Sequence, residues 1–324
     1  MNINKVMAVL TRRNMQLLPV IILLAIVMTL LTDSFMSTQN IINLGNRISI
    51  NLIIAAGMTL LITSGGIDLS VGSTAGLSAT VAAIYFQSGF SDIAGPYGAI
   101  LFGLGIGAAV GFVNGILVAF MGLPAFIATL GTMLAVRGLV FIWSGGRTIM
   151  GFDQSYIDTF SGFTMGVPRA VIAAVMTVLV ASYILNRTVT GRLLQGLGGN
   201  ERCLHTAGIR ITSLKLGAYI MMGTLAGLAG LTLSASMSAA EPFAGSWFEL
   251  DAIAVVVMGG TLLAGGRGTL MGTTLGAILL GLVANSINLL GISAYYHTFV
   301  VGAMIMIAII IGSPVISGAR GRAH

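Results

Sequence analysis

The sequence predicts an all-α, polytopic integral membrane protein, and three observations support this fold class. Of the 324 residues, 56% are hydrophobic and only 7% are charged, whereas soluble domains carry about 25% charged residues. The mean hydropathy is +1.01. The 45 glycines suit membrane helices, because small residues let neighbouring backbones approach closely. A chain of this composition cannot cover a surface that faces water, so we expect residues 1–324 to form a single transmembrane domain surrounded by lipid.

About ten apolar runs are candidates for transmembrane helices. Some are shorter than the ~20 residues that a helix needs to cross a bilayer. Short or glycine-interrupted segments are tolerated where they line a cavity inside the protein, so we expect some of these helices to be broken. In order, the runs are Met15–Leu31, Ile48–Thr63, Thr74–Phe86, Gly98–Phe120, Ala125–Trp143, Arg169–Leu185, Leu214–Ala235, Leu250–Ala264, Thr269–Leu290 and His297–Ile311.

The first run follows three basic residues, Lys5, Arg12 and Arg13, a flank that a secretory signal peptide also has. However, its apolar core is longer than the ~7–15 residues of a signal peptide, and no small-x-small cleavage site follows it. We therefore expect an uncleaved first helix with the N-terminus in the cytoplasm.

The charged loops give the whole chain one orientation. From a cytoplasmic N-terminus, about ten crossings place the basic segment 187–215 and the C-terminal residues Arg320 and Arg322 in the cytoplasm, in agreement with the positive-inside rule. Both termini are therefore expected to be cytoplasmic. The loops 144–168 and 238–249, which carry acidic residues, fall outside. Three basic residues that also fall outside fit the rule less well: Arg47, Arg147 and Arg169.

The stretch SGGIDLSVGS, Ser64 to Ser73, interrupts an apolar region with polar residues and glycines. Because glycine disfavours helix interiors, we expect a helix to end here. Asp68 and Ser70 have two interpretations. They cap the following helix, since both residue types accept hydrogen bonds from free backbone N–H groups, or they line a path or gate for a solute, since ionisable residues inside membrane segments are commonly functional.

Further polar residues lie in later apolar runs. Asn114, Asn285 and Asn288 join Asp68 and Ser70 as candidate residues of a solute path. Hydrogen bonds between packed helices explain the two later asparagines at least as well. The stretch from Glu249 opens with two carboxylates, which favour a helix N-terminus. It is then interrupted at GGTLLAGGRG and continues with a GxxxG spacing that suits helix packing.

The longest polar stretch expected in the cytoplasm is TGRLLQGLGGNERCLHTAGIRITSLKL, Thr190 to Leu216. Its glycines flank a short predicted helix from about Glu201 to Ala207. This loop, about 187–213, is either a solvated basic loop that holds the topology or a docking surface for a cytoplasmic partner.

Several kinds of site have no signature in the sequence. The single cysteine, Cys203, and three separated histidines form no metal-binding pattern, so we expect no metal. There is no nucleophile elbow and no phosphate-binding loop. We therefore expect no enzymatic activity and no cofactor bound by this chain, and any ATP would be bound by another chain. The net charge of +6 reflects the orientation of the loops and does not indicate nucleic-acid binding.

Four motifs occur in order over nearly the whole chain: GMTLLITSGGIDLSVGS, LPAFIATLGTMLAVRG, GRLLQGLGGN followed by AGI, and ELDAIAVVVMGGTLLAGGRGTLMGT. Together they resemble the permease subunit of ribose/xylose/galactose-type sugar importers of the ATP-binding-cassette class. The resemblance implies a protein of the bacterial inner membrane that translocates a sugar, a ribose-like pentose or a hexose, delivered by a periplasmic binding protein. It also implies a second permease chain, identical or a paralogue, and a separate cytoplasmic ATPase that uses ATP and Mg²⁺.

The resemblance further implies that the cytoplasmic loop couples the permease to the ATPase. At Leu204 and His205 the chain departs from the family, in which small residues, often paired alanines, are usual. We therefore expect a docking surface specific for one ATPase, with Leu204 in a groove of that partner. The residues assigned to coupling are Gly191, Arg192, Gly199, Asn200, Glu201, Leu204, His205 and Gly208.

Two other functional classes compete with this interpretation. An ion-coupled secondary transporter of a small polar solute needs a buried ionisable relay, and the sequence offers little at mid-span beyond Asp68 and Arg137. A membrane enzyme needs a nucleophile–base pair or a metal cluster, and neither pattern occurs. The sequence does not specify which sugar is carried.

Overall fold

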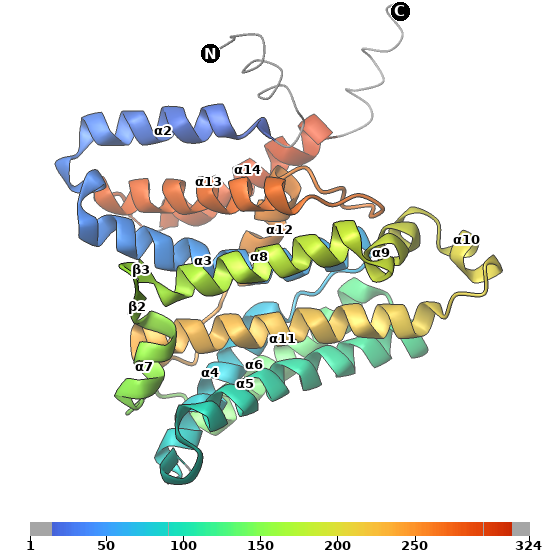
Figure 1. Ribbon diagram of the computed structural model, residues 1–324, viewed down its shortest axis with the longest axis horizontal. Helices are drawn as coiled ribbons and strands as arrows, with labels where there is room; N and C mark the ends of the chain where they lie inside the picture. Colours follow the sequence, from blue (N-terminus) through green and yellow to red (C-terminus); the bar gives the residue numbers. More distant parts are fainter. Residues whose placement is uncertain (1–14, 90, 294, 313–324) are drawn as a thin grey trace, which may run out of the picture.

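A computed structural model describes residues 15–89, 91–293 and 295–312. Over these residues the chain forms a bundle in which most helices run along the long axis of the molecule (Figure 1). The helices are α2 (Leu18–Leu31), α3 (Thr38–Thr63), α4 (Val71–Gln87), α5 (Ser91–Gly115), α6 (Ala125–Ser144), α7 (Gln154–Ser161), α8 (Arg169–Arg187), α9 (Val189–Gly199), α10 (Glu201–Thr206), α11 (Ile211–Met237), α12 (Phe248–Met258), α13 (Leu270–Leu289) and α14 (Tyr295–Gly312). A short 3₁₀ helix, η2 (Asp33–Met36), follows α2, and a π-helical turn, η3 (Ile116–Phe120), follows α5.

The loops contain four two-residue strands, β1 (Ile149–Met150), β2 (Phe163–Thr164), β3 (Val167–Pro168) and β4 (Ala239–Ala240). The basic residues that predict cytoplasmic termini, Lys5, Arg12, Arg13, Arg320 and Arg322, lie outside the described residues.

Six helical segments of the described chain are long and apolar enough to cross a membrane, which agrees with the predicted all-α membrane class. They are Thr38–Thr63, Ala94–Phe120, Ala125–Ser144, Arg169–Arg187, Ile211–Met237 and Leu270–Leu289. The other four predicted runs fall on α2, α4, α12 and α14. Because α2, α4 and α12 have 14, 17 and 11 residues, fewer than the ~20 of a straight crossing, the count of about ten spans stays a prediction.

Three predicted helix boundaries are wrong, and one of them is the start of α5 at Ser91 instead of Gly98, where a kink at Gly95 joins a short first segment to the rest of the helix. α3 begins at Thr38, well before the predicted start at Ile48, because its polar first turns include Asn40, which is buried against α13. α12 ends at Met258 and does not continue to Ala264, because the chain turns at Gly260, whose φ is 87°. Glycine adopts this left-handed conformation without steric cost, and a helix ends there.

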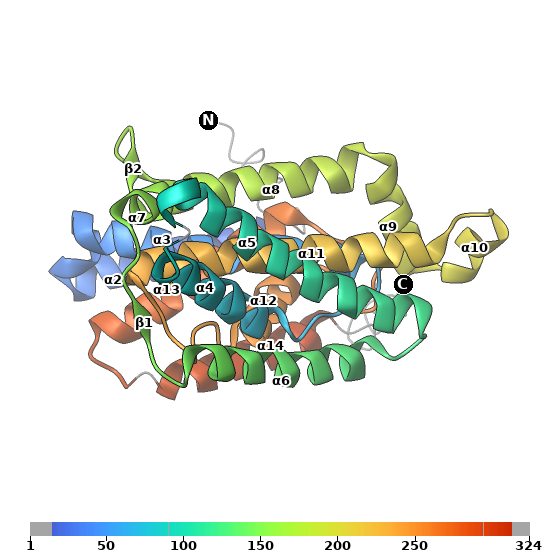
Figure 2. The same cartoon turned by 90° about the horizontal axis from the view of Figure 1, so that it is seen from below.

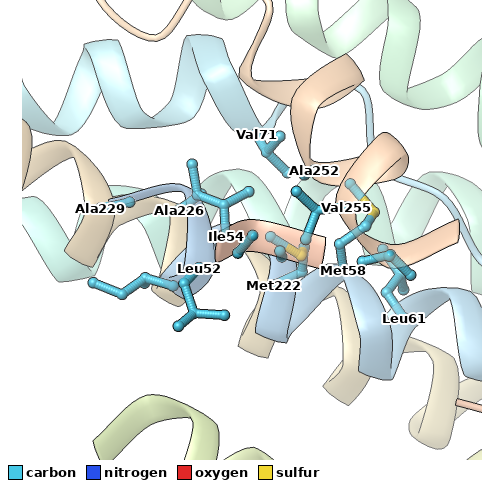
Figure 3. Packing of buried hydrophobic residues seen from close by; sticks show 14 of the residues in the cluster. Leu52, Ile54, Met58, Leu61, Val71, Met222, Ala226, Ala229, Ala252 and Val255 are labelled. Atoms are coloured by element: carbon cyan, nitrogen blue, oxygen red, sulfur yellow. The ribbon is translucent and has the colours of Figure 1, made fainter. Parts of the chain in front are cut away.

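α3 lies at the centre of the bundle, between α8, α11, α12 and α13. Figure 3 shows Ile54 and Met58 of α3 packed with Met222 and Ala226 of α11 and Val255 of α12. Every residue of α3 from Leu52 to Thr63 is buried, and a helical segment that is buried on all sides is enclosed by other helices. α3 therefore forms the core against which the shorter helices are placed.

Glycines make the closest helix contacts. A β-carbon on Gly111 of α5 would collide with the carbonyl oxygen of Tyr219 on α11. Gly272 and Gly276 of α13 face the backbone of α12 in the same way, so the GxxxG spacing of the sequence is a helix–helix contact. Close packing of small residues is a main attraction between helices in lipid.

The two ends of the bundle carry different loops. α9 and α10 lie at one end, and α7 with the β2–β3 hairpin lies at the other (Figures 1 and 2). At the α7 end, β1 pairs with β4, with Ile149 opposite Ala240, and joins the loop after α6 to the loop after α11. The two loops predicted to lie outside therefore share one end, opposite the loop predicted to be cytoplasmic.

α7 is fixed by one cap and one buried tyrosine. The carboxylate of Asp153 accepts a hydrogen bond from the amide of Ser155 at 2.7 Å. Hydrogen bonds from the hydroxyl and amide of Ser155 hold the pKa of Asp153 below its usual value. The hydroxyl of Tyr156 is hydrogen-bonded to α11 at Leu231 and Ser234, so α7 is attached to the end of α11.

Candidate functional site

The predicted helix break at SGGIDLSVGS is confirmed. α3 ends at Thr63 and α4 begins at Val71. Gly65 turns the chain between them with a φ of 83°. The break carries Asp68 and Ser70 into the interior of the bundle, where both are buried.

Asp68, Ser70 and Asn114 form one hydrogen-bonded group, which we call the polar cluster. Oδ1 of Asp68 accepts hydrogen bonds from the amide of Ser70 at 2.8 Å, from its hydroxyl at 2.6 Å and from Nδ2 of Asn114 at 3.2 Å. Nδ2 of Asn114 also donates to Oγ of Ser70 at 2.8 Å. Each of the three residues is 1% exposed or less. Three candidate path residues from two separate parts of the sequence are therefore in direct contact.

Asp68 does not cap α4. A capping side chain accepts hydrogen bonds from amides inside the first turn of a helix, but Asp68 accepts one from Ser70, which precedes α4. α4 has no side-chain cap. Asp68 instead closes a turn within the break and joins that turn to α5 through Asn114, so the capping interpretation is wrong and the path interpretation stays a prediction.

One acceptor in the polar cluster is unused. Oδ1 of Asn114 is buried and has no hydrogen-bond partner among the described residues. Buried polar atoms are nearly always paired, so an unpaired acceptor at 0% exposure requires an explanation. A hydroxyl group is a donor that satisfies it.

Asn285 and Asn288 lie apart from this cluster. Asn285 on α13 exchanges two hydrogen bonds with Asn40 on α3, at 2.7 and 3.2 Å, which is the helix-packing role that the sequence left open. Asn288 is exposed near the end of α13. Over the described ranges, neither asparagine is hydrogen-bonded to the polar cluster.

A second polar contact, not predicted from the sequence, joins α6 to the loop before α12. Nη1 of Arg137 on α6 donates to the carbonyl oxygens of Pro242 and Ala244, both at 2.9 Å. This loop therefore receives two hydrogen bonds from a charged donor that is itself half-buried, and hydrogen bonds of a charged donor are stronger than neutral ones. The signal in the sequence is Arg137 itself, an arginine inside an apolar run. From the sequence alone, this arginine suggests an ion relay and gives no sign of a contact with backbone carbonyls.

Two glycines of α4 make room for this contact. A β-carbon on Gly76 would lie 3.1 Å from Nη1 of Arg137, and one on Gly72 would lie 2.6 Å from Oε2 of Glu249. Because these glycines are four residues apart, they lie on one face of α4. Arg137 and Glu249, at the start of α12, therefore both rest on the same face of α4.

α6 packs on α4 and α5 through a small apolar cluster, in which Val136 and Val140 meet Leu77 of α4 and Val110 of α5. It lies at the edge of the bundle (Figure 2), and beside this cluster an open cavity of about 590 Å³ lies between α6, α4 and α5. The cavity is lined by apolar side chains, among them Ile106, Val110, Ile127 and Trp143. Hydrogen bonds from Arg137 therefore add a polar attachment to a helix that is also held by apolar contacts.

α9 and α10 are both capped by side chains. The hydroxyl of Thr188 accepts a hydrogen bond from the amide of Gly191 at 3.1 Å, and the side chain of Asn200 accepts one from the amide of Cys203 at 3.1 Å. The predicted helix from Glu201 is confirmed as α10. Glu201 also forms an ion pair with Lys215 of α11, with 2.8 Å between Nζ and Oε1.

The predicted coupling residues differ in exposure. His205 is exposed, but Leu204 is half-buried, because its Cδ2 lies 3.3 Å from where a β-carbon on Gly196 of α9 would be. Leu204 therefore holds α10 against α9, and only part of it is free for a partner. Of the others, Gly191 is buried, and Arg192, Gly199, Asn200, Glu201 and Gly208 are exposed. In the part of the chain that is described, no three His, Cys, Asp or Glu residues are grouped to hold a metal ion.

Comparison with known proteins gives consistent matches. A family model for branched-chain amino acid transport system / permease component matches residues 40–309. The ribose import permease protein RbsC of Escherichia coli strain K12 is 41% identical over 300 residues, which cover 91% of this chain and 92% of that protein. RbsC of Bacillus subtilis strain 168 is 40% identical over 291 residues, 89% of each chain. The D-allose transport system permease protein AlsC of E. coli strain K12 is 34% identical over 288 residues, 89% of this chain and 87% of that protein. No solved structure is significantly similar to the chain.

Proposed function

The chain belongs to the permease-component family of branched-chain amino acid transport systems, and from this premise we propose that it is the membrane-spanning subunit of an ATP-driven sugar importer. It is a multi-pass protein of the bacterial inner membrane and a transport subunit. The observation that carries the proposal is similarity to sugar permeases over about nine tenths of the chain. Residues 1–324 then constitute one transmembrane domain.

The substrate class is a sugar, a ribose-like pentose or a hexose. The family description names amino acids, but the relatives that cover most of the chain are named for ribose and allose. A sugar offers several hydroxyl donors, and the unpaired Oδ1 of Asn114 is an acceptor for one of them. The acceptor suits a hydroxyl donor, and the choice of a sugar over an amino acid rests on the ribose and allose relatives.

The polar cluster lines the path in this proposal. Asp68, Ser70 and Asn114 are buried, so a solute reaches them only after α4 or α5 has moved. Asn288, exposed on α13, is a weaker candidate because it lies apart from the cluster, and Asn285 is already paired with Asn40.

About ten segments cross the membrane in the proposed topology, with both termini in the cytoplasm. α9 and α10 then lie on the cytoplasmic side, and α7 with the β1–β4 pair lies on the periplasmic side. The basic residues of the segment 187–215 support this orientation.

Energy comes from a separate cytoplasmic ATPase that binds ATP and Mg²⁺, while this chain binds no cofactor. The ATPase contacts α10 and the residues around it, from Gly191 to Gly208. A periplasmic binding protein delivers the sugar to the opposite end. A second permease chain, most simply a second copy, completes the path through lipid.

The test is uptake of labelled sugars by a strain that lacks this gene and is complemented with it. We expect accumulation of a pentose or hexose that stops when the ATPase subunit carries a substitution in its phosphate-binding lysine. Uptake of amino acids without uptake of sugars would refute the substrate class. Uptake that persists with the inactive ATPase and follows an ion gradient would identify an ion-coupled secondary transporter.

A further inference from the structure

Three chain segments meet through their backbones near the end of α9. They are the end of α3 (Thr63–Gly65), the end of α9 (Gly198–Gly199) and the loop between α12 and α13 (Gly265–Gly268), and we call their meeting point the glycine junction. The amide of Gly266 donates to the carbonyl oxygen of Thr63 at 2.9 Å. The junction therefore joins three elements that are far apart in the sequence.

The tightest contacts of the junction surround Gly198. A β-carbon there would collide with the carbonyl oxygen of Thr63 and the amide nitrogen of Gly266, and would lie 3.0 Å from Cα of Gly265. All of these are backbone atoms, so no change of side-chain rotamer makes room. The next residue is different, because a β-carbon on Gly199 meets nothing within 4 Å.

Gly268 makes a second tight contact, this time with a side chain. A β-carbon on Gly268 would collide with the hydroxyl oxygen of Thr63. That hydroxyl donates to the carbonyl oxygen of Thr59 within α3. An alanine at position 63 would remove the obstacle and keep α3 helical, because alanine has the highest helix propensity.

The junction connects the proposed ATPase-binding helix with the polar cluster. α9 leads directly into α10 on one side, and the end of α3 leads to Asp68 on the other. The third segment leads into α13 through its cap at Thr269. The backbones touch with no flexible side chains between them that could absorb a movement. A displacement of α9 therefore shifts the other two segments by a similar amount.

We propose that Gly198 and Gly268 are positioning residues that transmit the displacement of α9 and α10 to the break carrying Asp68. The inference rests on the proposed function, in which α10 contacts the ATPase. Hydrolysis on another subunit changes this chain only through contacts that differ between the two states. The glycine junction supplies the route from those contacts to the solute path.

The first experiment compares Gly198→Ala with Gly217→Ala of α11 in the full importer, reconstituted with its ATPase and its sugar-loaded binding protein. Sugar uptake and ATP hydrolysis are measured on the same vesicles. We expect Gly198→Ala to lower the number of sugars moved per ATP by about tenfold, within the range of measured coupling free energies. Gly217→Ala should retain the wild-type ratio, because its added methyl group meets nothing within 4 Å and Gly217 lies outside the segment that contacts the ATPase.

The second experiment adds a methyl group at position 268 and then removes the Thr63 hydroxyl with which it collides. It keeps the proposal testable if Gly198→Ala is not inserted in the membrane. Gly268→Ala should also lower the ratio of uptake to hydrolysis. The double variant Gly268→Ala/Thr63→Ala should restore it, while Thr63→Ala alone stays at the wild-type ratio. A change that only weakened folding would lower the amount of permease and leave this ratio unchanged.

A wild-type ratio in inserted Gly198→Ala or in Gly268→Ala would overturn the inference, and so would failure of Thr63→Ala to rescue Gly268→Ala. If the proposed function itself is wrong, the outcome is different: the wild-type vesicles show no ATP-dependent sugar uptake at all.

Discussion

The side-chain nitrogen of Asn114 lies 2.8 Å from the hydroxyl oxygen of Ser70, so α5 is bonded directly to the break between α3 and α4. α11 holds the same break, because the hydroxyl of Tyr219 donates to the carbonyl oxygen of Ile67 at 3.2 Å. α5 and α11 are also in close contact with each other at Gly111. Movement of α5 away from the break therefore breaks the hydrogen bonds of Asn114, and movement of α11 away from it breaks that of Tyr219.

Asp68→Asn tests the role of the buried carboxylate. Asparagine keeps an acceptor for the amide of Ser70, so the turn is retained, but the charge is lost. Since a hydrogen bond to a charged group is worth about 1 kcal/mol more than a neutral one, we expect initial uptake rates to fall about fivefold at an unchanged amount of permease.

Asp153→Asn is the matched control, because Asp153 accepts a hydrogen bond from the amide two residues later in the same way, but at an exposed position. It should transport normally. If Asp68→Asn also transports normally, the only role of Asp68 is to close the turn.

Gly111→Ala tests the contact between α5 and α11. Its methyl group would collide with the carbonyl oxygen of Tyr219, and overpacking of this kind costs about 1–3 kcal/mol. We expect a lower midpoint of thermal unfolding in detergent. Gly105→Ala on the same helix meets nothing within 4 Å and should unfold at the wild-type temperature, and equal midpoints for the two variants would contradict the packing described here.

Arg137→Leu tests the contact between α6 and the loop before α12. The substitution leaves the carbonyl oxygens of Pro242 and Ala244 without their donor, and an unpaired buried acceptor costs about 1–3 kcal/mol. We expect loss of thermal stability and of uptake. Arg147→Leu, at an exposed position after α6, is the control, and a similar stability of both variants would show that Arg137 does not hold α6.

Leu204→Asp tests ATPase docking, measured by co-purification of the ATPase and by uptake. We expect both to be lost, because a charge replaces apolar burial on the order of 1–3 kcal/mol. Arg202→Ala should have little effect, since exposed charges contribute about 0–1 kcal/mol.

Leu204 also packs on Gly196, so a second variant separates docking from helix packing. His205→Asp changes an exposed side chain of α10 and should weaken co-purification too. Normal binding by His205→Asp, with none by Leu204→Asp, would assign Leu204 to holding α10 on α9.

Thiol labelling tests the proposed orientation. Cys203 is a free, exposed cysteine on α10, and a membrane-impermeant maleimide should reach it only from the cytoplasm. Glu241→Cys in a Cys203→Ser background should be labelled only from the periplasm. Glu241 suits labelling because its side chain is exposed, whereas the neighbouring Ala240 is only 1% exposed. Labelling of both sites from the same side would refute the topology.

The sequence predicted those features of the fold that depend on composition and local conformation. The break at Ser64–Ser73, the helix start beside Glu249 and the short helix at Glu201 all follow from glycine, capping and helix-dipole preferences. The structure has all three, with α12 starting at Phe248. The start of α3 was missed because polar residues such as Asn40 are satisfied by a partner on α13. Such a partner is 245 residues away in sequence and leaves no local signal.

Only part of the candidate site was predicted, because contacts between distant segments leave no local signal in the sequence. Asp68, Ser70 and Asn114 were each singled out as polar residues in apolar surroundings, but their contact depends on how α5 packs on the break. The contact of Arg137 with backbone carbonyls and the packing of Leu204 on Gly196 are tertiary contacts, which one sequence does not encode locally.

Among the described residues, the only ion pair is that of Glu201 and Lys215, in which Glu201 is exposed and Lys215 is half-buried. Dissolved salt shortens the range of exposed charges to about 3 Å at 1 M, but it does not weaken packing between apolar or backbone surfaces. A salt wash should therefore remove proteins that are held to the basic segment 187–215 by exposed charges alone, and should leave an ATPase docked through Leu204 on the folded bundle. Hydrolysis measured on washed vesicles then reports the docked ATPase without a contribution from loosely adsorbed proteins.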